Sequence, residues 1–144
     1  MRSLVGVSGL DSRFWITRGA STLTWTTRLL QGLLAVAFIG FGFLKLFAHP
    51  LQVDAFTGTY GYSVSFMYLV GAVELAAGAG LVLGFWQPRV ALFAVGVIAL
   101  IMAGAMMTHV RSAASMRTSV PPLIFLAMAL WVIAAGYRRR ARAR

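Results

Sequence analysis

The chain has 144 residues, of which 60% are hydrophobic and only 11% are charged. Soluble domains are typically about one quarter charged, so this composition excludes an ordinary soluble enzyme and predicts an integral membrane protein. Basic residues outnumber acidic ones by 13 to 3, but they flank apolar segments as topology determinants and lipid contacts do, so we expect no nucleic-acid binding.

The N-terminal segment, residues 1–23, mixes aromatic, basic and polar side chains. Asp11 or Ser12 would cap a short amphipathic helix that lies in the cytoplasmic interface of the membrane. A flexible tail is the other interpretation. Both interpretations place this segment outside the bilayer core.

The first membrane span is predicted at residues 24–48. Trp25 and Arg28 suit the headgroup level at its start. The pair His49-Pro50 ends the helix, because proline cannot continue its hydrogen bonding. A polar connection follows, which is too long for a tight turn.

The rest of the chain predicts three more spans and a basic tail. The spans lie at residues 63–85, 90–108 and 119–137, and the tail at 138–144. A short turn joins the second and third spans, which therefore form an antiparallel hairpin. We expect Pro121-Pro122 in the first turn of the fourth span, where proline is well tolerated.

The basic residues also predict an orientation. Ten of them lie on the side of the two termini and three, Lys45, Arg111 and Arg117, on the opposite side. The positive-inside rule therefore places both termini in the cytoplasm, and we expect the plasma (inner) membrane. Anionic lipids are the expected partners of the arginine-rich tail.

Small residues recur at helix-packing intervals in the first two spans, as at Gly71 and Gly78. Such spacing is typical of membrane helices that approach closely. The predicted fold class is therefore all-α: a polytopic membrane protein whose single domain, residues 24–137, is an antiparallel four-helix transmembrane bundle.

Three polar residues form the candidate site. Glu74 lies near the middle of the second span, where a charge costs about 2.5–3.5 kcal/mol. Helical side chains lean toward the N-terminus of their own helix, so Lys45 leans inward and Glu74 outward, and the two converge. His109 ends the third span on the same side. We expect an intramembrane polar binding pocket of Lys45, Glu74 and His109, with no catalytic residue.

Simpler interpretations stay open for each of these residues. Lys45 is close enough to the helix end to extend its ammonium to the headgroups alone. Glu74 would then be a structural group that sets helix register, and His109 an interfacial side chain. The chain has no cysteine, and methionines such as Met102 are common packing material, so we expect no metal.

Several short stretches carry a family resemblance. They lie at residues 28–34, 42–46, 71–78 and 88–92, with His109 closing the third helix. In order and spacing they resemble the DoxX family of small four-helix membrane proteins, over residues 28–110. Some relatives are associated with thiosulfate and quinone chemistry, so the resemblance implies a quinone as the candidate cofactor. No redox-active residue is matched in this chain.

Three functions are compatible with these observations. The favoured one is a non-catalytic or quinone-interacting membrane subunit of an oxidoreductase assembly, which requires an oxidoreductase partner protein. The second is a module that binds or transports a small solute, a proton or a lipid, as a homo-oligomer if one chain is insufficient. The third is a structural scaffold or assembly factor for other membrane proteins.

Overall fold

The computed structural model describes residues 8–112 and 116–142, and the side chains within 24–112, 119–138 and Ala141. Every regular element in these residues is helical. The elements are α1 (Ser8–Leu46), α2 (Pro50–Val53), the π-helix η1 (Asp54–Thr59), α3 (Val64–Leu83), α4 (Pro88–Arg111) and α5 (Met116–Arg142). The side chains of the expected N-terminal segment, residues 1–23, lie outside the described residues.

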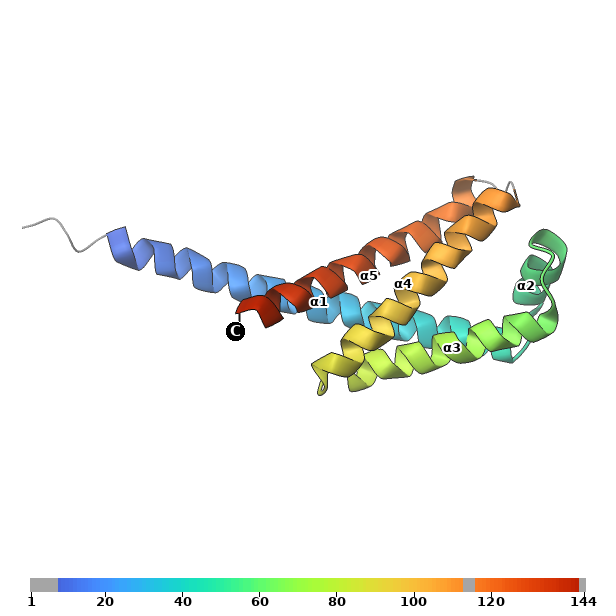
Figure 1. Ribbon diagram of the computed structural model, residues 1–144, viewed down its shortest axis with the longest axis horizontal. Coiled ribbons are helices and arrows are strands. Elements are labelled where there is room, and N and C mark those ends of the chain that lie inside the picture. Colours follow the sequence, from blue (N-terminus) through green and yellow to red (C-terminus); the bar gives the residue numbers. More distant parts are fainter. Residues whose placement is uncertain (1–7, 113–115, 143–144) are drawn as a thin grey trace, which may run out of the picture.

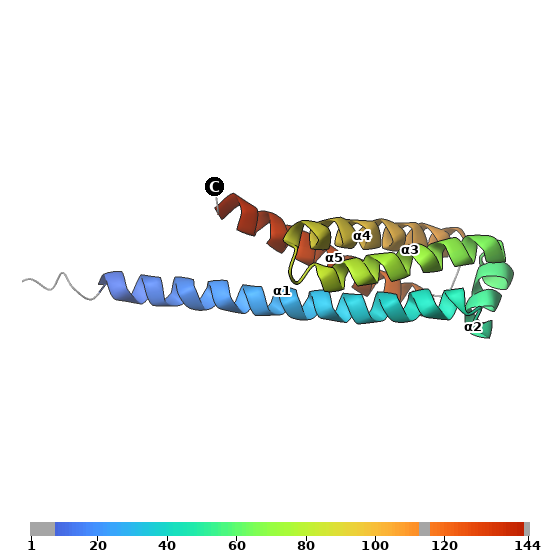
Figure 2. The same cartoon turned by 90° about the horizontal axis from the view of Figure 1, so that it is seen from below.

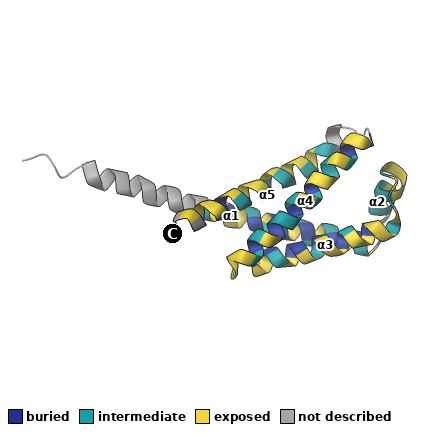
Figure 3. Cartoon of the chain, viewed as in Figure 1, coloured by how far each residue is buried: buried dark blue, intermediate teal, exposed yellow. Residues whose placement is uncertain are grey.

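Four stretches of these helices are long and apolar enough to cross a bilayer. They are Thr24–Leu46, Val64–Leu83, Pro88–Arg111 and Ser119–Arg138. Large hydrophobic side chains such as Leu29, Val36 and Phe93 are exposed, as expected for contact with lipid. Exposed positions recur along the helices (Figure 3). The predicted fold class is confirmed: the protein is an all-α integral membrane protein with four transmembrane helices.

The helices are arranged as two crossing pairs. α1 lies beside α3, and α4 beside α5, and the pairs diverge toward the end that carries α2 (Figures 1 and 2). We call this end the α2 end, and the opposite end, where α3 turns into α4, the turn end. The C-terminal end of α5 lies at the turn end (Figure 1).

Glycines allow the close contact between α1 and α3. A Cβ atom at Gly42 would lie 2.8 Å from both the Gly71 carbonyl oxygen and the Leu75 nitrogen. A Cβ atom at Gly78 would lie 2.7 Å from an Ile39 side-chain carbon and 2.9 Å from the Ile39 nitrogen. Because these neighbours are largely backbone, the helices approach this closely only where side chains are absent.

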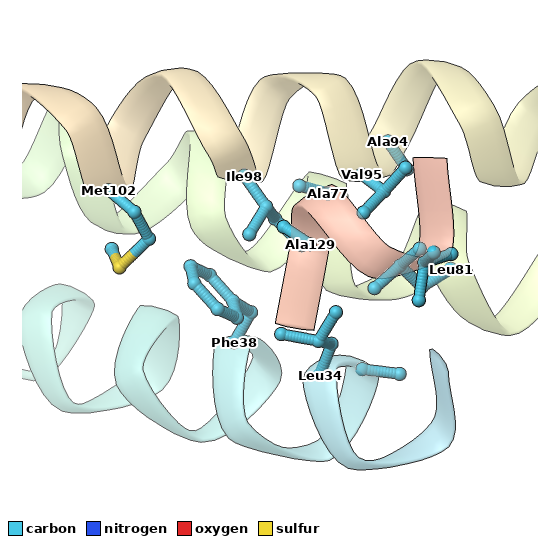
Figure 4. Close-up of a cluster of buried hydrophobic side chains, with 11 residues drawn as sticks. Leu34, Phe38, Ala77, Leu81, Ala94, Val95, Ile98, Met102 and Ala129 are labelled. Atoms are coloured by element: carbon cyan, nitrogen blue, oxygen red, sulfur yellow. The ribbon is translucent and has the colours of Figure 1, made fainter. Parts of the chain in front are cut away.

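The hydrophobic core lies between the two helix pairs. Leu34 and Phe38 of α1, Leu81 of α3 and Ile98 of α4 are fully buried (Figure 4). Met102 packs in the same cluster. This layer fixes the crossing of the pairs, and it separates the α2 end from the turn end.

The connection after α1, predicted only as polar and too long for a tight turn, is largely helical. α1 ends in a left-handed turn: Ala48 has a φ of 50°, the His49 nitrogen donates to the Leu44 oxygen, and the Ala48 nitrogen to the Lys45 oxygen. This is the Schellman pattern that terminates helices. Pro50 then starts α2, because its fixed φ suits a first helical position.

The fourth span begins at Ser119, as predicted, but its helix begins earlier. α5 begins at Met116, so Pro121 and Pro122 lie inside the helix and not in its first turn. Each proline removes one helical hydrogen bond. Both prolines border a cavity between the helix pairs, and non-ideal helical backbone is tolerated in membrane proteins where it lines a cavity.

Gln31 completes the hydrogen bonding at the end of α3. The Phe85 nitrogen, which would bond the Leu81 carbonyl in a continuing helix, donates to the Val82 oxygen. The buried Gln31 Nε2 donates to the Leu81 oxygen at 2.8 Å instead. We expect Gln31→Leu to lower the free energy of unfolding by about 1–3 kcal/mol, because a buried carbonyl loses its donor. Unfolding in mixed micelles would measure this, and a loss below about 0.5 kcal/mol would contradict it.

Candidate functional site: a cavity at the α2 end

Lys45 and Glu74 form a buried ion pair between α1 and α3. The Lys45 Nζ donates to the Glu74 Oε2 at 2.7 Å. Only 9% of the lysine side chain and 4% of the glutamate side chain are exposed, so Lys45 does not extend to the headgroups. The ammonium also lies 5.7 Å from the centre of the Phe41 ring and 5.8 Å from that of Phe56, within cation–π range. The pairing expected from side-chain direction is present.

A cavity of about 480 Å³ lies beside the ion pair, where the helix pairs diverge. This volume falls within the range of about 300–1,000 Å³ that is typical of small-molecule sites. Its walls are mainly apolar and aromatic, and include Phe41, Phe66, Val70, Ile101 and Phe125. Lys45, Glu74 and His109 all border it, so the structure gathers the three predicted residues around one space.

His109 lies in the last turn of α4 and borders the cavity. One of its two ring nitrogens has a hydrogen-bond partner. Its Nε2 lies 3.1 Å from the Tyr60 hydroxyl. Its Nδ1 is buried and has no hydrogen-bond partner, although the residue is only 8% exposed. Buried polar atoms are nearly always paired in native proteins, and each unpaired one costs about 1–3 kcal/mol. The Nδ1 is therefore an unsatisfied polar atom in a residue that borders the cavity.

The segment of residues 50–62 lines part of the cavity. It contributes Phe56, Tyr60 and Tyr62 to the lining, and two hydrogen bonds hold it to α4. Besides the Tyr60–His109 bond, the Tyr62 hydroxyl lies 3.0 Å from the Thr108 hydroxyl. Burial raises the pKa of Tyr60, so its phenol stays protonated at physiological pH.

Sequence reasoning missed these aromatic residues. They lie outside the spans and match no motif. Their signal was the density of aromatic side chains at 56, 60 and 62, within a connection otherwise interpreted as polar. Aromatic rings so close to a membrane span are typical of packing against the span and not of a solvated loop.

This arrangement suits binding more than bond cleavage. An ammonium, a carboxylate, an imidazole and a phenol border an apolar space, which fits a lipophilic molecule with a hydrogen-bonding head. Among the residues with described side chains, no three His, Cys, Asp or Glu residues lie close enough to hold a metal ion.

Comparison with known proteins identifies a family and a relative. The sequence profile of the DoxX-like family matches residues 29–132. An uncharacterised protein of Bacillus subtilis (strain 168), YdgD, is 28% identical over 105 residues, which cover 72% of this chain and 91% of the relative. No solved structure matches the chain. Lys45, Glu74 and His109 all lie within the matched region.

Proposed function

This chain belongs to the DoxX-like family, and from that premise we propose that it is a quinone-interacting membrane subunit of an oxidoreductase assembly. We place it in the plasma (inner) membrane with both termini in the cytoplasm, because the basic residues gather on the side of the termini. A partner oxidoreductase would exchange electrons with the quinone, while this chain holds the quinone at the α2 end of the bundle.

One observation carries this proposal: two residues with hydrogen-bonding side chains, Lys45 and His109, both line one apolar cavity. Lys45 supplies an ammonium, and His109 supplies an imidazole nitrogen without a partner. A quinone ring has two carbonyl oxygens, both acceptors, and an apolar chain. The aromatic walls suit the ring and the chain, and the two polar groups suit the carbonyls.

The chain's own residues have distinct tasks in this proposal. Glu74 holds the Lys45 ammonium at the cavity and balances its charge. If Tyr60 donates its hydroxyl proton to the His109 Nε2, the neutral ring carries its proton on Nδ1 and becomes a donor toward the ligand. Tyr60 is thus a positioning residue for His109.

We expect His109→Phe to weaken the binding of a short-chain ubiquinone by about tenfold, the loss of one hydrogen bond to a buried ligand group. Equilibrium binding to the purified protein in lipid nanodiscs would measure it. His49→Phe is the matched control, because His49 is exposed at the same end and does not line the cavity. Equal affinities of the His109 and His49 variants would contradict the site.

Gentle purification, followed by mass spectrometry of co-purifying proteins and lipophiles, tests the function itself. A dehydrogenase or a quinone that accompanies the protein, and is lost with His109→Phe, would support the redox subunit. A homo-oligomer without either, which catalyses solute or proton flux in liposomes, would favour transport. A co-purifying membrane protein without quinone-linked activity would favour a scaffold.

A further inference from the structure

A second cavity lies at the turn end, on the opposite side of the core from the ion pair. Its volume is about 280 Å³. α1 contributes Thr27, Arg28 and Gln31, and the beginning of α4 contributes Pro88 and Ala91. Gly136 of α5 completes the wall. This volume is just below the range of drug-sized pockets, and it suits a small head group better than a whole lipid.

This end of the bundle is basic and lies at the headgroup level. Arg28, Arg89 and Arg138 are exposed there. Asp54 and Glu74, the only acidic residues whose side chains the structure describes, belong to the α2 end. Three exposed aromatic side chains, Trp25, Trp86 and Tyr137, surround the same end, as the interfacial aromatic belt of membrane proteins does.

Arg28 supplies the positive charge in the wall of this cavity. Pro88 and Ala91, in the first turn of α4, also line the cavity, but Pro88 has no N–H and the Val90 and Ala91 nitrogens donate to the Gln87 oxygen. The guanidinium of Arg28, which is suited to bidentate contact with phosphate oxygens, is therefore the group that would hold an anion there.

We propose that the turn-end cavity binds the phosphate of an anionic glycerophospholipid, with Arg28 as the main contact. Gln31, buried and oriented by its bond to the Leu81 oxygen, forms the polar floor beside the phosphate. Leu92 and Val132 form the apolar part of the wall, on which the first carbons of the lipid pack. The proposal does not depend on quinone binding at the α2 end.

Native mass spectrometry of the full chain tests this site with phosphatidylglycerol and with phosphatidylcholine of the same acyl chains. We expect phosphatidylglycerol to bind more tightly than phosphatidylcholine. Arg28→Gln should lower the affinity for phosphatidylglycerol by about tenfold, because it removes a charge-assisted contact. Arg138→Gln is the matched control, because it removes an exposed arginine at the same end that does not line the cavity. Its affinity should stay within about twofold of the unaltered protein.

A second variant separates the cavity from general surface charge. Leu92→Phe adds bulk to the cavity wall and leaves every arginine in place, so it should also weaken the binding of phosphatidylglycerol. Soluble glycerol phosphate distinguishes a free phosphate ligand from a lipid head group: competition by it would assign the site to phosphate in general. Equal losses for Arg28→Gln and Arg138→Gln, or full binding by Leu92→Phe, would overturn the proposal.

Discussion

Replacing Lys45 by methionine is expected to lower the free energy of unfolding by about 3–5 kcal/mol. The Glu74 carboxylate would then remain between α1 and α3 without the cation that now lies 2.7 Å away. With both side chains over nine-tenths buried, water cannot replace the lost partner without opening the helix contact. The loss should appear in equilibrium unfolding of the detergent-solubilised protein by increasing fractions of a denaturing detergent.

The double variant Lys45→Met/Glu74→Gln is the control for this experiment. It removes both charges, so most of the lost stability should return, since apolar or neutral replacements of a whole buried pair are often nearly neutral. A loss below about 1 kcal/mol for Lys45→Met alone would mean that the pair behaves as a solvated one.

The same double variant separates a binding role from a structural one. If it folds and no longer binds short-chain ubiquinone, the ion pair serves the ligand. If it folds and binds normally, Glu74 and Lys45 serve only the packing of α1 on α3. In that case the quinone proposal would rest on His109 alone.

Gly42→Ala is expected to destabilise the bundle by about 1–3 kcal/mol, the usual range for overpacking. The added methyl group would lie 2.8 Å from the Gly71 oxygen and the Leu75 nitrogen, so α1 and α3 must separate. Separation would also strain the ion pair, because Lys45 packs directly against Gly71. Unfolding in mixed micelles measures the stability, and ubiquinone binding reports the effect on the site.

Gly40→Ala is the matched control on the same helix. Apart from its chain neighbours and the nearby backbone of its own helix, no atom lies within 4 Å of a Cβ built at Gly40, so the methyl group would project into open space. We expect no loss, and up to about 1 kcal/mol of gain from the better helix propensity of alanine. If the two glycine variants had equal stability, close packing at Gly42 would not be the reason for the glycine.

Composition and apolar length were enough to predict the class of this protein. In lipid no water is present to bond the backbone polar groups of an apolar stretch. A helix bonds these groups within its own segment, so the four apolar stretches are expected to be helices. The pairing of Lys45 with Glu74 could also be predicted, because side-chain direction is a local property of each helix. The order and spacing of the short stretches carried a resemblance to the DoxX family, and the DoxX-like family profile that matches residues 29–132 confirms it.

The cavity, and the side chains that the segment 50–62 contributes to it, could not be predicted in this way. The volume beside the ion pair exists because the α1–α3 pair and the α4–α5 pair cross and diverge, which depends on contacts between residues far apart in the chain. The role of Tyr60 depends on how the segment 50–62 brings its side chains to the end of α4, and that of Gln31 on where α3 ends. Local patterns determine which segments enter the membrane. The crossing of the helices determines which polar groups meet, and it results from non-local packing at Gly42, Gly78 and the central core.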